Sequence, residues 1–229
     1  HDDKLLLQYQ GASWSFNQFF TAVDRLSQWM LTEKHITVGT PVAIAMRNRP
    51  EWLIAFVAVI NLGAVAVPLN SWGKSAELKQ GLEDSEAQLL ICDAPRWKFV
   101  QDSEGDVEAL IVDADTPTSQ QPEFASVITA SYHAPITPPL IDAQAPAILL
   151  FTSGTSGRPK GVMLSHFNCC QALMNLEFIG AATYMTNQEA MTAHLASPTA
   201  PKTLLAVPLF HISGLFSQFI VNMHHGRSL

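Results

Sequence analysis

Cysteine is scarce in this chain of 229 residues, and the few cysteines form no recognisable pattern. Cys92, Cys169 and Cys170 make neither a disulfide framework nor the spaced pairs of a metal site. Cys92 lies in an apolar run, where a free cysteine usually behaves as a small core hydrophobe. No Asn-x-Ser/Thr glycosylation acceptor occurs either. Both absences fit a protein of the reducing cytoplasm.

Positive charge is also in short supply. The chain has 13 lysines and arginines against 20 acidic residues, which gives a formal net charge of −7 and a pI of about 5.5. A protein that binds nucleic acid or an acidic membrane needs a basic surface. The composition therefore predicts no nucleic-acid partner, and the acidic balance is typical of a soluble protein.

The chain has no uninterrupted transmembrane segment. Residues 52–73 carry no charge, but Asn61, Gly63 and Pro68 break the run, and its second part has strand character. We expect a buried helix over residues 51–62 and then a buried strand. The opening residues, His-Asp-Asp-Lys, do not form a signal peptide. They also lack an initiator methionine, so we expect this sequence to be a piece of a longer protein.

Short apolar runs alternate with helical patterns along most of the chain. A capping box of Ser15 and Gln18 opens the first helix, and Pro50 stands at the start of the second. Helices are expected over residues 16–31, 51–62, 75–83, 124–130, 165–176 and 213–224, and strands over residues 42–46, 64–67, 88–92, 109–112, 147–151 and 203–207. Residues 113–144 are expected to be mostly loop, and residues 181–202 an irregular excursion. The alternation predicts an α/β fold of mostly parallel sheets flanked by helices in layers.

The segment Thr152-Ser-Gly-Thr-Ser-Gly-Arg-Pro-Lys-Gly161 directly follows a buried strand. Its glycines allow close backbone approach to an anion, its hydroxyls and free N–H groups donate hydrogen bonds, and Lys160 adds charge. The order differs from the Walker loop, because Lys160 lies three residues after Gly157 and is followed by Gly161. Such residues would also fit a solvated turn between strand and helix. The lysine and the preceding strand favour a phosphate-binding loop.

A second strand, over residues 203–207, leads into His211. Ligands of open α/β sheets bind beyond the carboxyl ends of the strands, so the glycine loop and His211 would face one crevice if both strands share a sheet. A histidine that closes a strand and caps the next helix is the alternative. The adjacent His224 and His225 diverge on a helix and have no evident third ligand, so we expect them on the surface rather than at a metal.

Four segments, in the same order along the chain, resemble the adenylate-forming enzymes. This superfamily contains acyl-CoA synthetases, peptide-synthetase adenylation domains and firefly luciferase. The loop at residues 152–161 resembles their phosphate-loop motif, and the other three segments are Trp14-Ser-Phe-Asn-Gln-Phe-Phe20, Asn61-Leu-Gly-Ala-Val-Ala-Val-Pro-Leu-Asn70 and Pro208-Leu-Phe-His-Ile-Ser-Gly214. The first departs from the family pattern at Gln18 and Phe19. The last is similar to the segment of acyl- and aryl-CoA ligases.

The resemblance implies a two-step reaction. A small-molecule carboxylate, fatty or aryl, displaces pyrophosphate from ATP, and the thiol of coenzyme A then takes the acyl group from the adenylate; Mg²⁺ is the implied metal. The residues implied to hold the ATP phosphates are Thr152, Ser153, Gly154, Thr155, Ser156, Gly157 and Lys160. His211 is implied to lie beside the acyl pocket and the adenylate as a candidate catalytic residue. No metal ligand is implied within this chain.

The resemblance also implies that residues 1–229 are the N-terminal portion of one AMP-binding domain, with subdomain boundaries near residues 70 and 203. The family's adenine-contacting segment, ribose-binding aspartate and mobile C-terminal domain have no matching positions, so we expect the fragment alone to be inactive. Two alternatives stay open: a truncated, non-catalytic nucleotide- or acyl-binding module, and an adenylation domain that loads a carrier protein. No aspartate follows Phe210, which argues against an amino-acid substrate. Nothing in the sequence indicates an oligomeric state.

Overall fold

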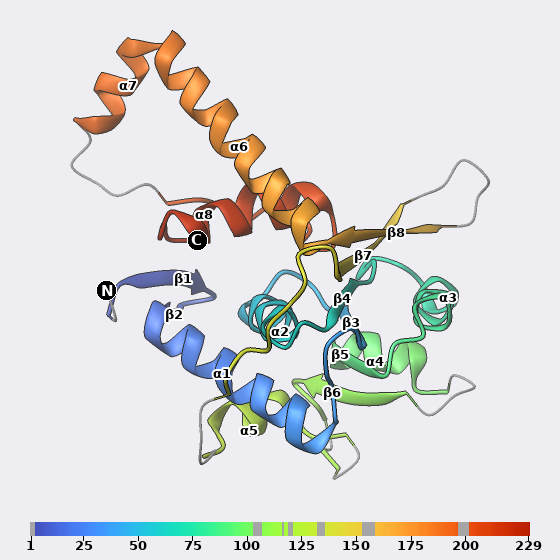
Figure 1. The fold of residues 1–229 in the computed structure, drawn as a ribbon. Coiled ribbons are helices and arrows are strands. Elements are labelled where there is room, and N and C mark those ends of the chain that lie inside the picture. The colour runs from blue at the N-terminus through green and yellow to red at the C-terminus, as the bar shows by residue number, and fades with distance from the viewer. Residues whose placement is uncertain are drawn as a thin grey trace.

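Helices cover both faces of a central six-stranded sheet (Figure 1). The computed structural model describes residues 3–102, 107–115, 117–118, 121–131, 136–152, 159–196 and 202–229. The strands of the sheet are β3 (Pro41–Ala45), β4 (Val65–Pro68), β5 (Leu89–Asp93), β6 (Glu108–Val112), β7 (Pro146–Thr152) and β8 (Lys160–Ser165). Their order is β6-β5-β3-β4-β7-β8, with every neighbouring pair parallel except β7 and β8. The sequence-based prediction of a mostly parallel α/β sheet is therefore confirmed.

The central residues of the parallel strands are apolar because both faces of the sheet are buried there. In β3, Val42 and Ile44 face the larger of two hydrophobic cores, and Ala43 and Ala45 face the smaller one. The same alternation runs through β4, β5 and β6. Cys92 faces the smaller core, and burial raises the pKa of its thiol, as expected for a structural cysteine.

Two groups of helices enclose these cores. The larger core lies under α1 (Phe16–Glu33), α2 (Pro50–Asn61), α5 (Phe124–Thr129) and the π-helix η1 (Ser213–Ile220), which continues into α8 (Val221–His224). The smaller core lies under α3 (Ser75–Ser85) and α4 (Ala94–Val100). The uncharged run after Glu51 forms α2 and then β4, both buried in the protein interior, as predicted. Within the described ranges, no helix combines the length and the apolarity needed to cross a bilayer.

A small antiparallel hairpin precedes α1 and was not predicted. It consists of β1 (Leu5–Tyr9) and β2 (Ala12–Ser15), which turn through Gln10 and Gly11 at positive φ. The backbone of β1 also pairs with the last residue of the chain: the Gln8 N–H donates to the Leu229 carbonyl (2.9 Å), and the Leu229 N–H donates to the Leu6 carbonyl (2.7 Å). The two ends of the chain therefore lie side by side (Figure 1).

The elements expected between residues 16 and 151 are confirmed, with ends that differ by a few residues. The capping box is present, since the Ser15 hydroxyl accepts from the Gln18 N–H (3.2 Å) and the Gln18 side chain accepts from the Ser15 N–H (2.8 Å).

Beyond residue 151, the helix expected from Ser165 is confirmed, with Ser165 as its N-cap, but two other expectations are wrong. The chain after the glycine loop also forms a strand that was not predicted, β8, which pairs with β7. The helices α6 (His166–Thr186) and α7 (Gln188–Leu195) then occupy much of the stretch expected to be irregular, which is rich in the helix formers Ala and Met. Residues 203–207 form no strand, and in this part of the described chain only Lys202 makes a bridge, to Ser228.

Candidate functional site

The residues that follow the parallel strands gather at one edge of the sheet, because parallel strands all end on the same side. Arg47 and Asn48 follow β3, Ser71 follows β4, Asp93 ends β5, and Thr152 ends β7. This edge is where ligands of open α/β sheets bind.

The two ends of the glycine loop, Thr152 and Lys160, lie on an antiparallel pair of strands at this edge. Thr152 and Lys160 are directly paired across β7 and β8, and the Thr152 hydroxyl donates to the Lys160 carbonyl oxygen (3.3 Å). Both side chains are exposed. The residues predicted between them, Ser153, Gly154, Thr155, Ser156 and Gly157, lie outside the described residues. The described ends of the loop thus bring a hydroxyl and an ammonium group to the same sheet edge.

Gly161 permits close packing between these two strands. A Cβ atom at this position would lie 2.8 Å from the Cδ1 atom of Leu149 on β7. The clash would be with the flexible end of a side chain, so a small shift of Leu149 could relieve it. The glycine therefore favours tight strand pairing without being strictly required by it.

His211 reaches the sheet edge by a route that the sequence did not predict. The hypothesis that the strand before the loop and a strand before His211 share one sheet fails, because residues 203–207 form no strand. Instead, Asn48 binds this segment: its side-chain amide donates to the carbonyls of Val207 (2.8 Å) and Leu205 (3.3 Å) and accepts from the Leu209 N–H (3.0 Å). The imidazole of His211 is exposed and packs on the Phe210 ring, with centroids 4.4 Å apart.

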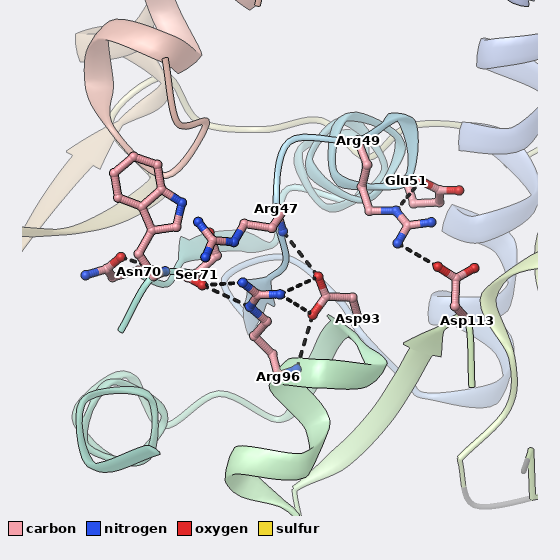
Figure 2. Close-up of polar contacts among 9 residues, drawn as sticks. Arg47, Arg49, Glu51, Asn70, Ser71, Asp93, Arg96 and Asp113 are labelled. Atoms are coloured by element: carbon pink, nitrogen blue, oxygen red, sulfur yellow. Dashed lines mark hydrogen bonds and ion pairs between the residues drawn. The ribbon is translucent and has the colours of Figure 1, made fainter. Parts of the chain in front are cut away.

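A buried ion pair supports the same edge (Figure 2). The Arg96 guanidinium contacts the Asp93 carboxylate (3.1 Å) and donates twice to the Ser71 carbonyl oxygen, at 2.8 and 2.9 Å. Asp93 also caps α4 and accepts from the backbone N–H of Arg47 (3.3 Å). This arrangement ties the ends of β3, β4 and β5 together.

Trp72 connects this edge to the segment that contains His211, because it contacts both Arg47 and Phe210. Its indole is 59% exposed and lies under the guanidinium of Arg47, 5.3 Å from ring centroid to Cζ. It also meets Phe210 edge to face, with centroids 6.0 Å apart. Burial, and then the nearby charge of Arg96, lower the pKa of Arg47. The result is a cationic and aromatic cluster beside His211.

A second ion-pair group lies at the start of α2. Arg49 binds Glu51 (2.7 Å) and Asp113 (2.9 Å), which follows β6 (Figure 2). Burial alone would lower the pKa of Arg49, but the hydrogen bonds to both carboxylates outweigh it and raise the pKa. The guanidinium therefore stays charged, and its bond to Asp113 connects the ends of β3 and β6.

Both histidines at the end of α8 are exposed, as expected. His225 Nε2 also lies 2.8 Å from a carboxylate oxygen of Glu177 on α6, so this histidine connects two helices.

Sequence reasoning missed Asn48, Asp93 and Arg96. Asp93 had a local signal, since an aspartate followed by alanine and proline at the end of an apolar run is typical of a helix N-cap. Asn48 had none, because its partners lie far away in the sequence. Arg96 lies three residues after its partner Asp93, but its bonds to Ser71 had no local signal.

Comparisons with known proteins agree with this architecture. The family model described as AMP-binding enzyme matches residues 1–229. A 2-succinylbenzoate–CoA ligase of Bacillus licheniformis is 34% identical over 79% of this chain and 32% of its own length. A hybrid PKS-NRPS synthetase of Xenoacremonium sinensis is 30% identical over 81% of this chain and 4% of its own length.

A solved structure shows the same fold. The O-succinylbenzoate coenzyme A synthetase of Bacillus subtilis, in complex with ATP and magnesium ion, is 25% identical with a TM-score of 0.70, over 99% of this chain and 53% of that one. This chain thus spans about a third of the B. licheniformis ligase and about half of the solved synthetase. Because the family model covers every residue of the sequence, the chain belongs to the AMP-binding enzyme family.

Proposed function

We propose that the protein containing this chain is an AMP-forming carboxylic acid–CoA ligase that activates a fatty or aryl acid with ATP. The observation that carries the proposal is the β7–β8 hairpin, which sets Lys160 opposite Thr152 at the ligand-binding edge of the sheet. Family membership and the ligase and synthetase relatives support it.

In this proposal, the hairpin loop holds the β- and γ-phosphates of ATP while the carboxylate attacks the α-phosphate. Negative charge accumulates on the leaving pyrophosphate, and oriented hydroxyl and N–H donors with a lysine ammonium stabilise it. The described ends of the loop, Thr152 and Lys160, supply one hydroxyl and one ammonium. Residues 153–157 would supply the remaining donors, and His211 would lie beside the acyl group.

Magnesium ions prefer oxygen ligands and often bind through substrate phosphates. The described ends of the hairpin offer a hydroxyl and an ammonium, which suit phosphate oxygens better than a divalent cation. In this proposal, phosphate oxygens rather than the hairpin would therefore ligate Mg²⁺.

The test is carboxylate-dependent exchange of labelled pyrophosphate into ATP by the full-length protein. Lys160→Ala should lower kcat/KM for exchange by about 100-fold, the usual effect of losing one donor to developing charge. Lys98→Ala is the matched control, since Lys98 is an exposed lysine on α4 that pairs with Asp115. Unchanged exchange in the Lys160 variant would remove the loop from the mechanism.

A second candidate function is loading of the acyl group onto a carrier protein. The similarity to a hybrid PKS-NRPS synthetase favours it. Supplying the adenylate-forming reaction with either CoA or a phosphopantetheinylated carrier protein separates the two functions. Acyl-CoA as the main product supports the ligase, whereas acyl-carrier as the main product supports the alternative.

A further inference from the structure

The segment that leads to His211 is held by two side chains, Asn48 and Gln218, and the Gln218 amide oxygen accepts from the Val207 N–H (3.3 Å). Residues 203–207 have no sheet partners, yet three backbone groups of the segment bind Asn48, which lies more than 150 residues earlier. Both amide hydrogens and the amide oxygen of Asn48 are used, so the side chain is held in one orientation. These three bonds take the place of a strand pairing.

The backbone transmits this constraint to His211. The His211 N–H donates to the Pro208 carbonyl (3.1 Å), and the His211 carbonyl accepts from the Leu215 N–H (3.0 Å). Gly214 packs directly on the same turn, where a Cβ atom would lie only 2.3 Å from the Pro208 oxygen. The turn between Leu209 and η1 is therefore rigid, and a shift of Leu209 would move His211 with it.

Phe210 is confined from the other side. It is 7% exposed and rests edge to face on Trp72, whose loop is held by the buried bonds from Arg96 to Ser71. His211 thus lies on a turn with two contacts to the sheet edge. Asn48, after β3, binds the Leu209 N–H, and Trp72, in the loop after β4, packs against Phe210.

We propose that Asn48 is a positioning residue for His211, placing the imidazole at the ligand edge of the sheet for the adenylation step. This inference rests on the proposed function for the role of His211, and on the described hydrogen bonds for the role of Asn48. An asparagine is well suited to the task, because it satisfies two carbonyls and one N–H of an irregular segment at once.

The structural arm of the test is hydrogen exchange of the full-length protein, followed by mass spectrometry on peptides covering residues 205–211. Asn48→Ala should speed exchange of the Leu209 amide about tenfold or more, because its acceptor is gone. Asn48→Asp keeps an acceptor but sets a carboxylate oxygen against the carbonyls of Leu205 and Val207, so it should also speed exchange of the Leu209 amide. The control is Asn17→Ala, at an exposed asparagine on α1. Unchanged exchange of this peptide in Asn48→Ala would overturn the inference even if the protein had no ligase activity.

The catalytic arm is a double-mutant cycle on pyrophosphate exchange. Asn48→Ala should lower kcat about tenfold with little change in KM for ATP, since a misplaced group loses rate rather than nucleotide binding. In a protein that already carries His211→Ala, Asn48→Ala should lower kcat by less than about twofold, because the imidazole that Asn48 positions is absent. If Asn48→Ala lowered kcat by the same factor with and without His211→Ala, Asn48 would act only on general structure, and the positioning role would be overturned. If the unmodified protein showed no pyrophosphate exchange, the proposed function would be refuted. The hydrogen-exchange experiment would then decide whether Asn48 holds the segment that leads to His211.

Discussion

At the scale of single residues, one ion pair of α4 is buried and another is exposed. Asp93 and Arg96 are 4% and 8% exposed, and every polar atom of the pair that faces the protein is hydrogen-bonded. Lys98 and Asp115 form an ion pair of similar length whose side chains are 63% and 71% exposed. Removing one partner of a buried pair leaves an uncompensated charge, whereas an exposed charge returns to water.

Arg96→Leu should therefore destabilise the protein by about 3 kcal/mol or more, and Lys98→Leu by less than about 1 kcal/mol. The measurement is urea-induced unfolding of both variants at neutral pH, followed by far-UV circular dichroism. If both variants lost a similarly small amount of unfolding free energy, water would have to reach Asp93 when Arg96 is absent. Trp72 provides a local probe, because the loop that carries it loses both bonds from Arg96 in the first variant only.

At the scale of elements, capping decides where α1 begins. The helix has no acidic residue in its first turn, so the reciprocal bonds of Ser15 and Gln18 are its main N-terminal stabilisation. Ser15→Ala should cost about 1 kcal/mol of unfolding free energy. The comparison is Ser13→Ala, at an exposed serine of β2 just outside the helix. Equal stabilities of the two variants would contradict a role for the capping box.

Helices and strands whose start, end and apolar spacing are all visible in their own residues could be predicted from the sequence. The helix α1 has a capping box and a helical apolar period, and β3 to β6 are apolar runs bounded by turns, so each needed only local information. The chemistry of the 152–161 loop was equally local. The position of β7 beside β4 was not, because it depends on strand order.

Elements stabilised by distant partners could not be predicted. Residues 203–207 have the composition of a buried strand, but the Asn48 side chain occupies the backbone groups that a sheet would use. The strand β8 is mostly exposed and so shows no apolar alternation, and its identity follows only from pairing with β7. In α6, none of the described side chains is fully buried, which removes the periodic signal that marks a helix on a core.

At the scale of the whole molecule, stability is unevenly distributed between the sheet and the helix α6. The helix α2 lies inside the larger core, whereas α6 rests on the body by its first turns and extends away from it (Figure 1). Its exposed side carries a stripe of large apolar residues at helical spacing: Phe167, Met174, Phe178 and Met185. Near its middle, Glu177 connects it to His225.

This difference predicts how the 229-residue chain opens. Amides of α2 should exchange with solvent only through global unfolding, because α2 is enclosed by the core on nearly every side. Amides of α6 beyond Glu177 should exchange far faster through local fraying, since no fully buried side chain holds this part of the helix. Native-state hydrogen exchange at two protein concentrations measures both. If the far half of α6 were protected as strongly as α2, its apolar stripe would have to be covered. Protection that rises with concentration would then identify a second copy of the chain as the cover, because only an intermolecular contact responds to concentration.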